Sequence, residues 1–71
     1  MEKSIATWGR RIRAFRKLKR LTQKELAERV HVSVFVLGSI ERGGQGPPTQ
    51  LLQDIADALG ISLSELKGGG I

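Results

Sequence analysis

Apolar residues recur at intervals of three or four along most of the chain, which is the spacing of helices that bury one face. The pattern predicts helices at about residues 5–19, 22–30 and 33–42, a fourth ending near residue 59, and a short fifth after residue 62. Their inward stripes predict one core, made of Trp8, Ile12, Phe15, Leu21, Leu26, Ala27, Val30, Val32, Leu37, Ile40, Leu52, Ile55, Ala56 and Leu59. We therefore expect an all-α domain with no sheet.

Polar residues at the predicted helix starts agree with this periodicity. Thr22 and Glu25 have the spacing of a capping box, in which each side chain bonds to the backbone of the other residue. Ser62 and Glu65 repeat the pattern before the fifth helix, and Ser33 is a favourable N-cap for the third. The helix boundaries are therefore specified locally as well as by the apolar stripes.

Residues 30–36 also allow a second interpretation. Valine stands at every other position of this segment, and such a period of two in β-branched residues is typical of a strand. The capping box before the segment and the sequence Ile-Glu-Arg-Gly after it favour the helix. On that interpretation, residues 23–43 form a helix, a tight turn at residues 31–32 and a second helix. Two helices joined by so short a turn form a unit that places one helix in the major groove of DNA.

Composition restricts the chemistry that is available. Seventy-one residues make one small domain, and without cysteine and with one histidine neither a disulfide nor a zinc site is expected. No nucleophile–base pair is visible, so we expect neither an enzyme nor a cofactor. The chain has no apolar run of membrane-spanning length and no signal-peptide pattern, so a cytoplasmic location is expected.

The net charge of +5 is unevenly distributed along the chain. Residues 1–20 hold eight basic side chains and one acidic one, a net charge of +7, whereas residues 21–71 hold four and six, a net charge of −2. The positive field therefore belongs to the first predicted helix. Such a field suits a phosphate backbone or an acidic partner, and the alternative is a helix face that is merely solvated.

Five segments, taken in their order along the sequence, resemble the lambda-repressor and Cro-like, or XRE-type, helix-turn-helix domains of bacterial and phage regulators. The matching segments are WGRRIRAFR at 8–16, LTQKELA at 21–27, VS at 32–33, IERG at 40–43 and LLQDIADALGISLSEL at 51–66. The resemblance implies a compact five-helix DNA-binding domain over residues 1–66, with helices two and three as the helix-turn-helix. The glycine-rich residues 67–71 are expected to form a disordered tail.

The resemblance also implies which residues meet DNA. It predicts that the start of the second helix contacts the phosphate backbone and that the early third helix enters the major groove. The candidate DNA-binding residues are Arg16, Thr22, Gln23, Ser33, Val34, Phe35, Val36, Gly38, Ser39 and Arg42. It further implies a bidentate ion pair between Arg16 and Glu41. Arg20 and His31 stand where the family usually has glycine, so both are expected at positive φ.

The third helix departs from the family in its polarity. Base edges are read by hydrogen-bonding side chains, and of these its outward positions retain only Ser39. Val34 and Phe35 can contact a thymine methyl group but supply no hydrogen bond. Two hypotheses follow. The first is a transcriptional regulator that binds double-stranded DNA, for which a two-fold site would require a homodimer. The second is a protein-interaction module that uses Val34, Phe35 and Val36 as an apolar patch.

Overall fold

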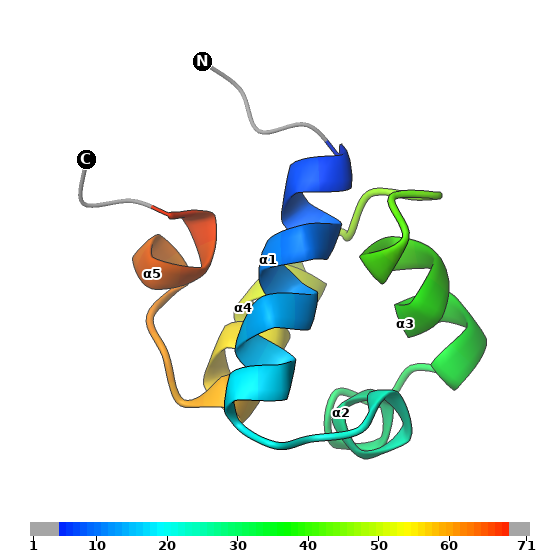
Figure 1. The fold of residues 1–71 in the computed structure, drawn as a ribbon, viewed down its shortest axis with the longest axis horizontal. Coiled ribbons are helices and arrows are strands. Elements are labelled where there is room, and N and C mark those ends of the chain that lie inside the picture. The colour runs from blue at the N-terminus through cyan, green and yellow to red at the C-terminus, as the bar shows by residue number, and fades with distance from the viewer. Residues whose placement is uncertain (1–4, 69–71) are drawn as a thin grey trace.

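The computed structural model describes residues 5–68, which form five α-helices and no strand. The helices are α1 (Ile5–Leu18), α2 (Gln23–Arg29), α3 (Val34–Glu41), α4 (Thr49–Leu59) and α5 (Leu63–Lys67). Helix α1 crosses the middle of the molecule, with α4 behind it, α5 on one side and the α2–α3 pair on the other (Figure 1). The predicted helix ends agree with these bounds to within about one residue, and the strand alternative for residues 30–36 is wrong.

The core lies where α1 meets the other helices, and it confirms most of the predicted set. The buried residues are Ile12, Leu26, Ala27, Val30, Leu37, Ile40, Leu51, Leu52, Ile55, Ala56, Leu59 and Leu66. Trp8, Phe15, Leu21 and Val32 were expected in the core, but they are half-buried and pack against its edge. Leu51 and Leu66 complete the core and were absent from the predicted set.

Both predicted capping boxes are present. The Glu25 backbone N–H donates to Thr22 Oγ1 at 3.0 Å, and the Thr22 backbone N–H donates to Glu25 Oε1 at 2.8 Å. The backbone N–H of Thr22 is the main reason that the pKa of the Glu25 carboxyl lies below its usual value. Because the folded pKa is lowered, this cap stabilises the fold at neutral pH and weakens as the pH falls through that pKa.

Helix α5 is held against α1 by an arginine rather than by apolar contacts alone. Arg11 Nε donates to the Leu66 carbonyl at 2.7 Å, and its Nη2 donates to the Glu65 carbonyl at 2.8 Å. These carbonyls belong to the last turn of α5, and the Glu65 carbonyl also accepts from the backbone N–H of Gly68 at 3.0 Å. Arg11 therefore caps α5 from another helix and also stacks over the Phe15 ring at 5.5 Å.

The C-terminal boundary differs from the one expected from composition. Lys67 is the last residue of α5, and Gly68 closes the helix as a left-handed C-cap with φ 81°. The expected tail therefore cannot begin at residue 67, because residues 67 and 68 are part of the ordered helix end. Residues 69–71, the rest of that predicted tail, lie outside the described residues, as do residues 1–4.

Gly9 permits a close approach of α1 and α3. A Cβ atom at Gly9 would lie 2.3 Å from the Ile40 carbonyl oxygen and 2.6 Å from the Glu41 carbonyl oxygen. Both atoms are backbone, so a side chain at this position would push α1 and α3 apart. The sequence pattern did not reveal this contact.

We predict that Gly9→Ala lowers the free energy of unfolding by about 1–3 kcal/mol or more, because the methyl group overlaps rigid backbone. Denaturant unfolding measures it. Gly38→Ala is the matched control, since Gly38 is also inside a helix but its Cβ would meet side-chain ends rather than backbone, Arg42 Nη1 at 3.1 Å and the Gln23 amide at 3.7 Å or more. The control should be neutral or stabilised by up to about 1 kcal/mol. Equal effects of the two substitutions would contradict the role given to Gly9.

The two non-glycine residues expected at positive φ are found there, Arg20 at φ 61° and His31 at φ 60°. A left-handed conformation strains such a residue by about 1–2 kcal/mol. We predict that His31→Gly leaves the free energy of unfolding unchanged or raises it by less than about 1 kcal/mol, because relief of strain is partly offset by a freer unfolded chain. Thermal melts measure the change, and Arg20→Gly should have the same effect on the free energy of unfolding. A clear loss in His31→Gly alone would reveal an interaction of the imidazole.

Candidate nucleic-acid interface

A buried ion pair joins α1 to the end of α3. Arg16 Nε donates to Glu41 Oε2 at 2.7 Å, and Arg16 Nη2 donates to Glu41 Oε1 at 3.0 Å, which is the predicted bidentate geometry. The side chains are 9% and 2% exposed. The third guanidinium nitrogen, Nη1, donates to the Leu21 carbonyl at 2.8 Å and so ties the α1–α2 loop to the same pair.

Helix α2 joins this network through its first residue. Gln23 Nε2 donates to Glu41 Oε1 at 3.0 Å, so the Glu41 carboxylate accepts from two helices at once. Beside the pair lies an open notch of about 590 Å³, lined by Arg13, Arg16, Thr22, Gln23, Glu41 and Arg42. The notch thus gathers residues from α1, α2 and the end of α3 at one place.

The notch brings together four of the predicted DNA-binding residues, Arg16, Thr22, Gln23 and Arg42. Arg16 was expected to bind DNA, but all three of its guanidinium nitrogens donate inside the domain and its side chain is 9% exposed. Arg13 is an exposed residue of the notch that the sequence analysis missed. It precedes Arg16 by three positions, which places both on one face of α1.

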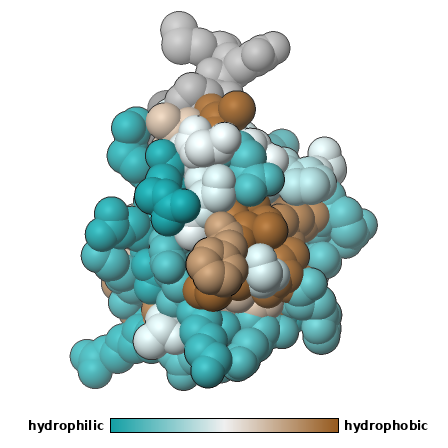
Figure 2. All heavy atoms as spheres, turned by 90° about the vertical axis from the view of Figure 1, so that its right-hand side faces the viewer, coloured by the Kyte–Doolittle hydropathy of each residue, from teal (hydrophilic) through white to brown (hydrophobic). Residues whose placement is uncertain are grey.

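The outward side of α3 is apolar. Phe35 is 83% exposed and Val34 37%, whereas Val36 is half-buried and packs against the core. Figure 2 faces the α3 side of the molecule and shows brown apolar surface there with hydrophilic side chains around it. Two further candidate DNA-binding residues are less exposed to solvent. Ser39 is half-buried, and Gly38 is buried next to the Gln23 and Arg42 side chains.

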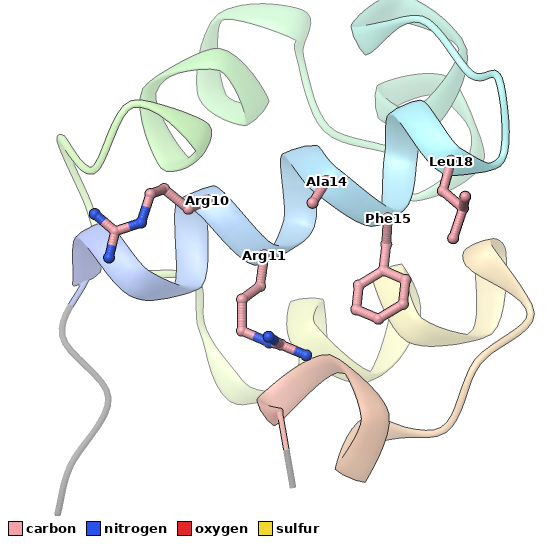
Figure 3. Close-up of a pocket in the computed structure, with 5 residues that line it drawn as sticks. All are labelled: Arg10, Arg11, Ala14, Phe15 and Leu18. Carbon is pink, nitrogen blue, oxygen red and sulfur yellow. The ribbon is translucent and has the colours of Figure 1, made fainter.

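A different hollow lies along α1 away from the notch residues. It has a volume of about 520 Å³ and is lined by Arg10, Arg11, Ala14, Phe15 and Leu18. Figure 3 shows Arg11 and Phe15 on the same side of α1, with Arg11 reaching to α5. Its wall is mostly apolar, and of its two arginines Arg11 is already engaged with α5.

Within residues 5–68, no group of three or more His, Cys, Asp or Glu side chains is placed to hold a metal ion. The same part of the chain contains no helix that is long and apolar enough to cross a membrane.

Comparison with known proteins identifies the family of this chain. A family model described as helix-turn-helix matches residues 12–66, which include the notch and all of α2 and α3. The chain belongs to this helix-turn-helix family. The match confirms the resemblance to the lambda-repressor and Cro-like regulators, and the family is one of transcriptional regulators rather than of enzymes.

Two similar proteins are named as a transcriptional regulator and as a repressor. The chain is 56% identical over 59 residues to an uncharacterized HTH-type transcriptional regulator, YazB, of Bacillus subtilis (strain 168), covering 83% of this chain and 86% of that protein. It is 44% identical over 62 residues to the immunity repressor protein of Bacillus phage phi105. That match covers 87% of this chain but 43% of the repressor, so the chain spans less than half of the repressor's length.

Solved structures share the five-helix fold. The clp gene regulator ClgR from Corynebacterium glutamicum superposes with a TM-score of 0.85 at 35% identity, over 87% of this chain and 66% of that one. The restriction-modification controller protein C.AhdI from Aeromonas hydrophila gives a TM-score of 0.84 at 31% identity, over 87% and 94%. These relatives are regulators, so the hypothesis of a protein-interaction module is not favoured.

We predict that Arg16→Ala and Glu41→Ala each lower the free energy of unfolding by about 3–5 kcal/mol, because either one leaves a buried charge without its partner. In a double-mutant cycle, the coupling energy should exceed about 1 kcal/mol. Arg13→Ala is the matched control on the exposed side of the same helix and should change stability by less than about 0.5 kcal/mol. A coupling energy near zero would show that Arg16 and Glu41 stabilise the domain independently.

Proposed function

We propose that this regulator binds double-stranded DNA with α3 in the major groove and with the cations of the notch on the flanking phosphates. The observation that carries the proposal is the position of Arg13 and Arg42. Both are exposed, both line the notch beside α3, and neither forms an ion pair within residues 5–68. Cations that the fold leaves unpaired are available to neutralise phosphate charge.

The capping hydroxyls support the same docking. Thr22 Oγ1 accepts from the Glu25 N–H, and Ser33 Oγ accepts from the Val36 N–H at 3.1 Å. Each hydroxyl keeps its own hydrogen, which can donate to a phosphate oxygen without breaking the cap. Thr22 and Ser33 therefore serve as backbone contacts at the starts of α2 and α3, together with the Gln23 amide.

The Arg16–Glu41 pair has a positioning role in this proposal. Arg16 and Glu41 fix where α3 stands relative to α1, while Arg13 supplies the phosphate contact that Arg16 was expected to make. A second copy of the chain on a two-fold related half-site remains a prediction, and the ratio of protein to duplex at saturation measures it.

We predict that duplex binding weakens steeply as salt rises, and that Arg13→Gln and Arg42→Gln each reduce the slope of log affinity against log salt by about one. The slope follows from the release of counterions when a cation neutralises a phosphate. Fluorescence anisotropy with a labelled random-sequence duplex at a series of salt concentrations measures it.

The matched control is Arg29→Gln, which removes the same charge from a hollow that contains His31, Asp54 and Asp57 instead of the notch. Its slope should equal that of the parent chain. If the two notch variants also keep the parent slope, the notch does not contact phosphate. If the parent binds no duplex even at low salt, the proposed function is wrong.

A further inference from the structure

Helix α3 offers few groups that could hydrogen-bond a base. The Ser33 hydroxyl caps α3 by accepting from the Val36 N–H, and its remaining hydrogen is assigned above to a phosphate, while Gly38 has no side chain. Ser39 is half-buried, and its Oγ lies 2.8 Å from the position that a Cβ on Gly44 would take, so it is packed against the loop after α3. Arg42 stands beyond the last residue of α3, far from its first turn.

The side chains exposed at the start of α3 are apolar. Val34 and Phe35 are its first two residues, and they are its exposed large hydrophobic side chains. When a helix of this class lies in the major groove, its N-terminal residues face the base edges. The apolar group on those edges is the 5-methyl group of thymine, and methylation of cytosine at C5 puts an equivalent group there.

We propose that Phe35, assisted by Val34, recognises the 5-methyl groups of pyrimidines in the major groove. This inference rests on the proposed function and names the chemical group that the regulator selects. Sequence preference would then come from burial of a methyl group against an aromatic ring and not from hydrogen bonds to base edges. The expected sites place thymine opposite the first turn of α3.

The surroundings of these two side chains favour DNA over a protein as the occupant of this face. Stable protein–protein interfaces bury about 800 Å² per partner around an apolar centre, and α3 exposes only two large apolar side chains. The neighbouring notch contributes the unpaired cations Arg13 and Arg42. An apolar tip flanked by cations matches a groove that displays methyl groups between two rows of phosphates.

The test begins with the 71-residue chain and a pool of random-sequence duplexes, from which repeated rounds of binding select preferred sites. In a selected site, each thymine is then replaced by uracil, which removes only the methyl group. At a contacted position the affinity should fall about fourfold, the effect expected for one methyl group returned to water. Replacing a contacted thymine–adenine pair by 5-methylcytosine–guanine should cost less than replacing it by cytosine–guanine.

Variants assign the effect to the side chain. Phe35→Ala should lose most of the preference for the thymine duplex over the uracil duplex, and because Phe35 is 83% exposed the variant should melt like the parent. Arg13→Gln is the control for general weakening, since it should lower both affinities and preserve the ratio between them. Val34→Ala should reduce the ratio less than Phe35→Ala does.

The outcomes distinguish a failure of methyl recognition from a failure of the proposed DNA binding. Salt-dependent duplex binding with equal affinity for thymine and uracil sites overturns methyl recognition and leaves the proposed function standing. A thymine preference that keeps its full parent value in Phe35→Ala overturns the role of Phe35. Absence of duplex binding, including a case in which α3 binds only a protein, overturns both.

Discussion

The charge on Glu41 is the constraint on which the arrangement of the helices depends. A carboxylate that is 2% exposed is costly unless its oxygens are paired, and here they accept from Arg16 on α1 and Gln23 on α2. Arg16 in turn donates to the carbonyl of Leu21. One acidic side chain at the end of α3 thereby fixes α1, α2 and the loop between them, since displacement of any of these would leave a buried charge or donor unsatisfied.

The backbone of the same residue sets a second constraint. The Glu41 carbonyl lies so near Gly9 that no side chain fits between α1 and α3 at that point. Gly9 and Arg16 are two helical turns apart on α1, and both meet the end of α3, Gly9 at the Ile40 and Glu41 carbonyls and Arg16 at the Glu41 carboxylate. The backbone contact limits the distance between the two helices there, and the ion pair holds the Glu41 side chain against α1. The position of this end of α3 is thus set by tertiary contacts as well as by the turn before the helix.

Features that depend on residues close in sequence were predictable, and those that depend on tertiary approach were not. Both capping boxes follow from local rules, and the structure confirms them. The left-handed His31 was expected from the family resemblance and is also confirmed. The contact at Gly9 and the bonds from Arg11 to α5 join residues more than thirty positions apart, so no local pattern indicates them. The family resemblance supplied the pairing of Arg16 with Glu41 but overstated how much of Arg16 stays open.

The separation of the exposed start of α3 from its buried side has a consequence for how such a regulator changes over evolutionary time. The residues that hold α3 in place are Leu37, Ile40 and Glu41, while Val34 and Phe35 project outward and contribute little to the core. Substitutions at the two outward positions therefore carry a small stability penalty. A duplicated copy of this domain could acquire a new set of target genes through one or two such changes, without first having to become more stable.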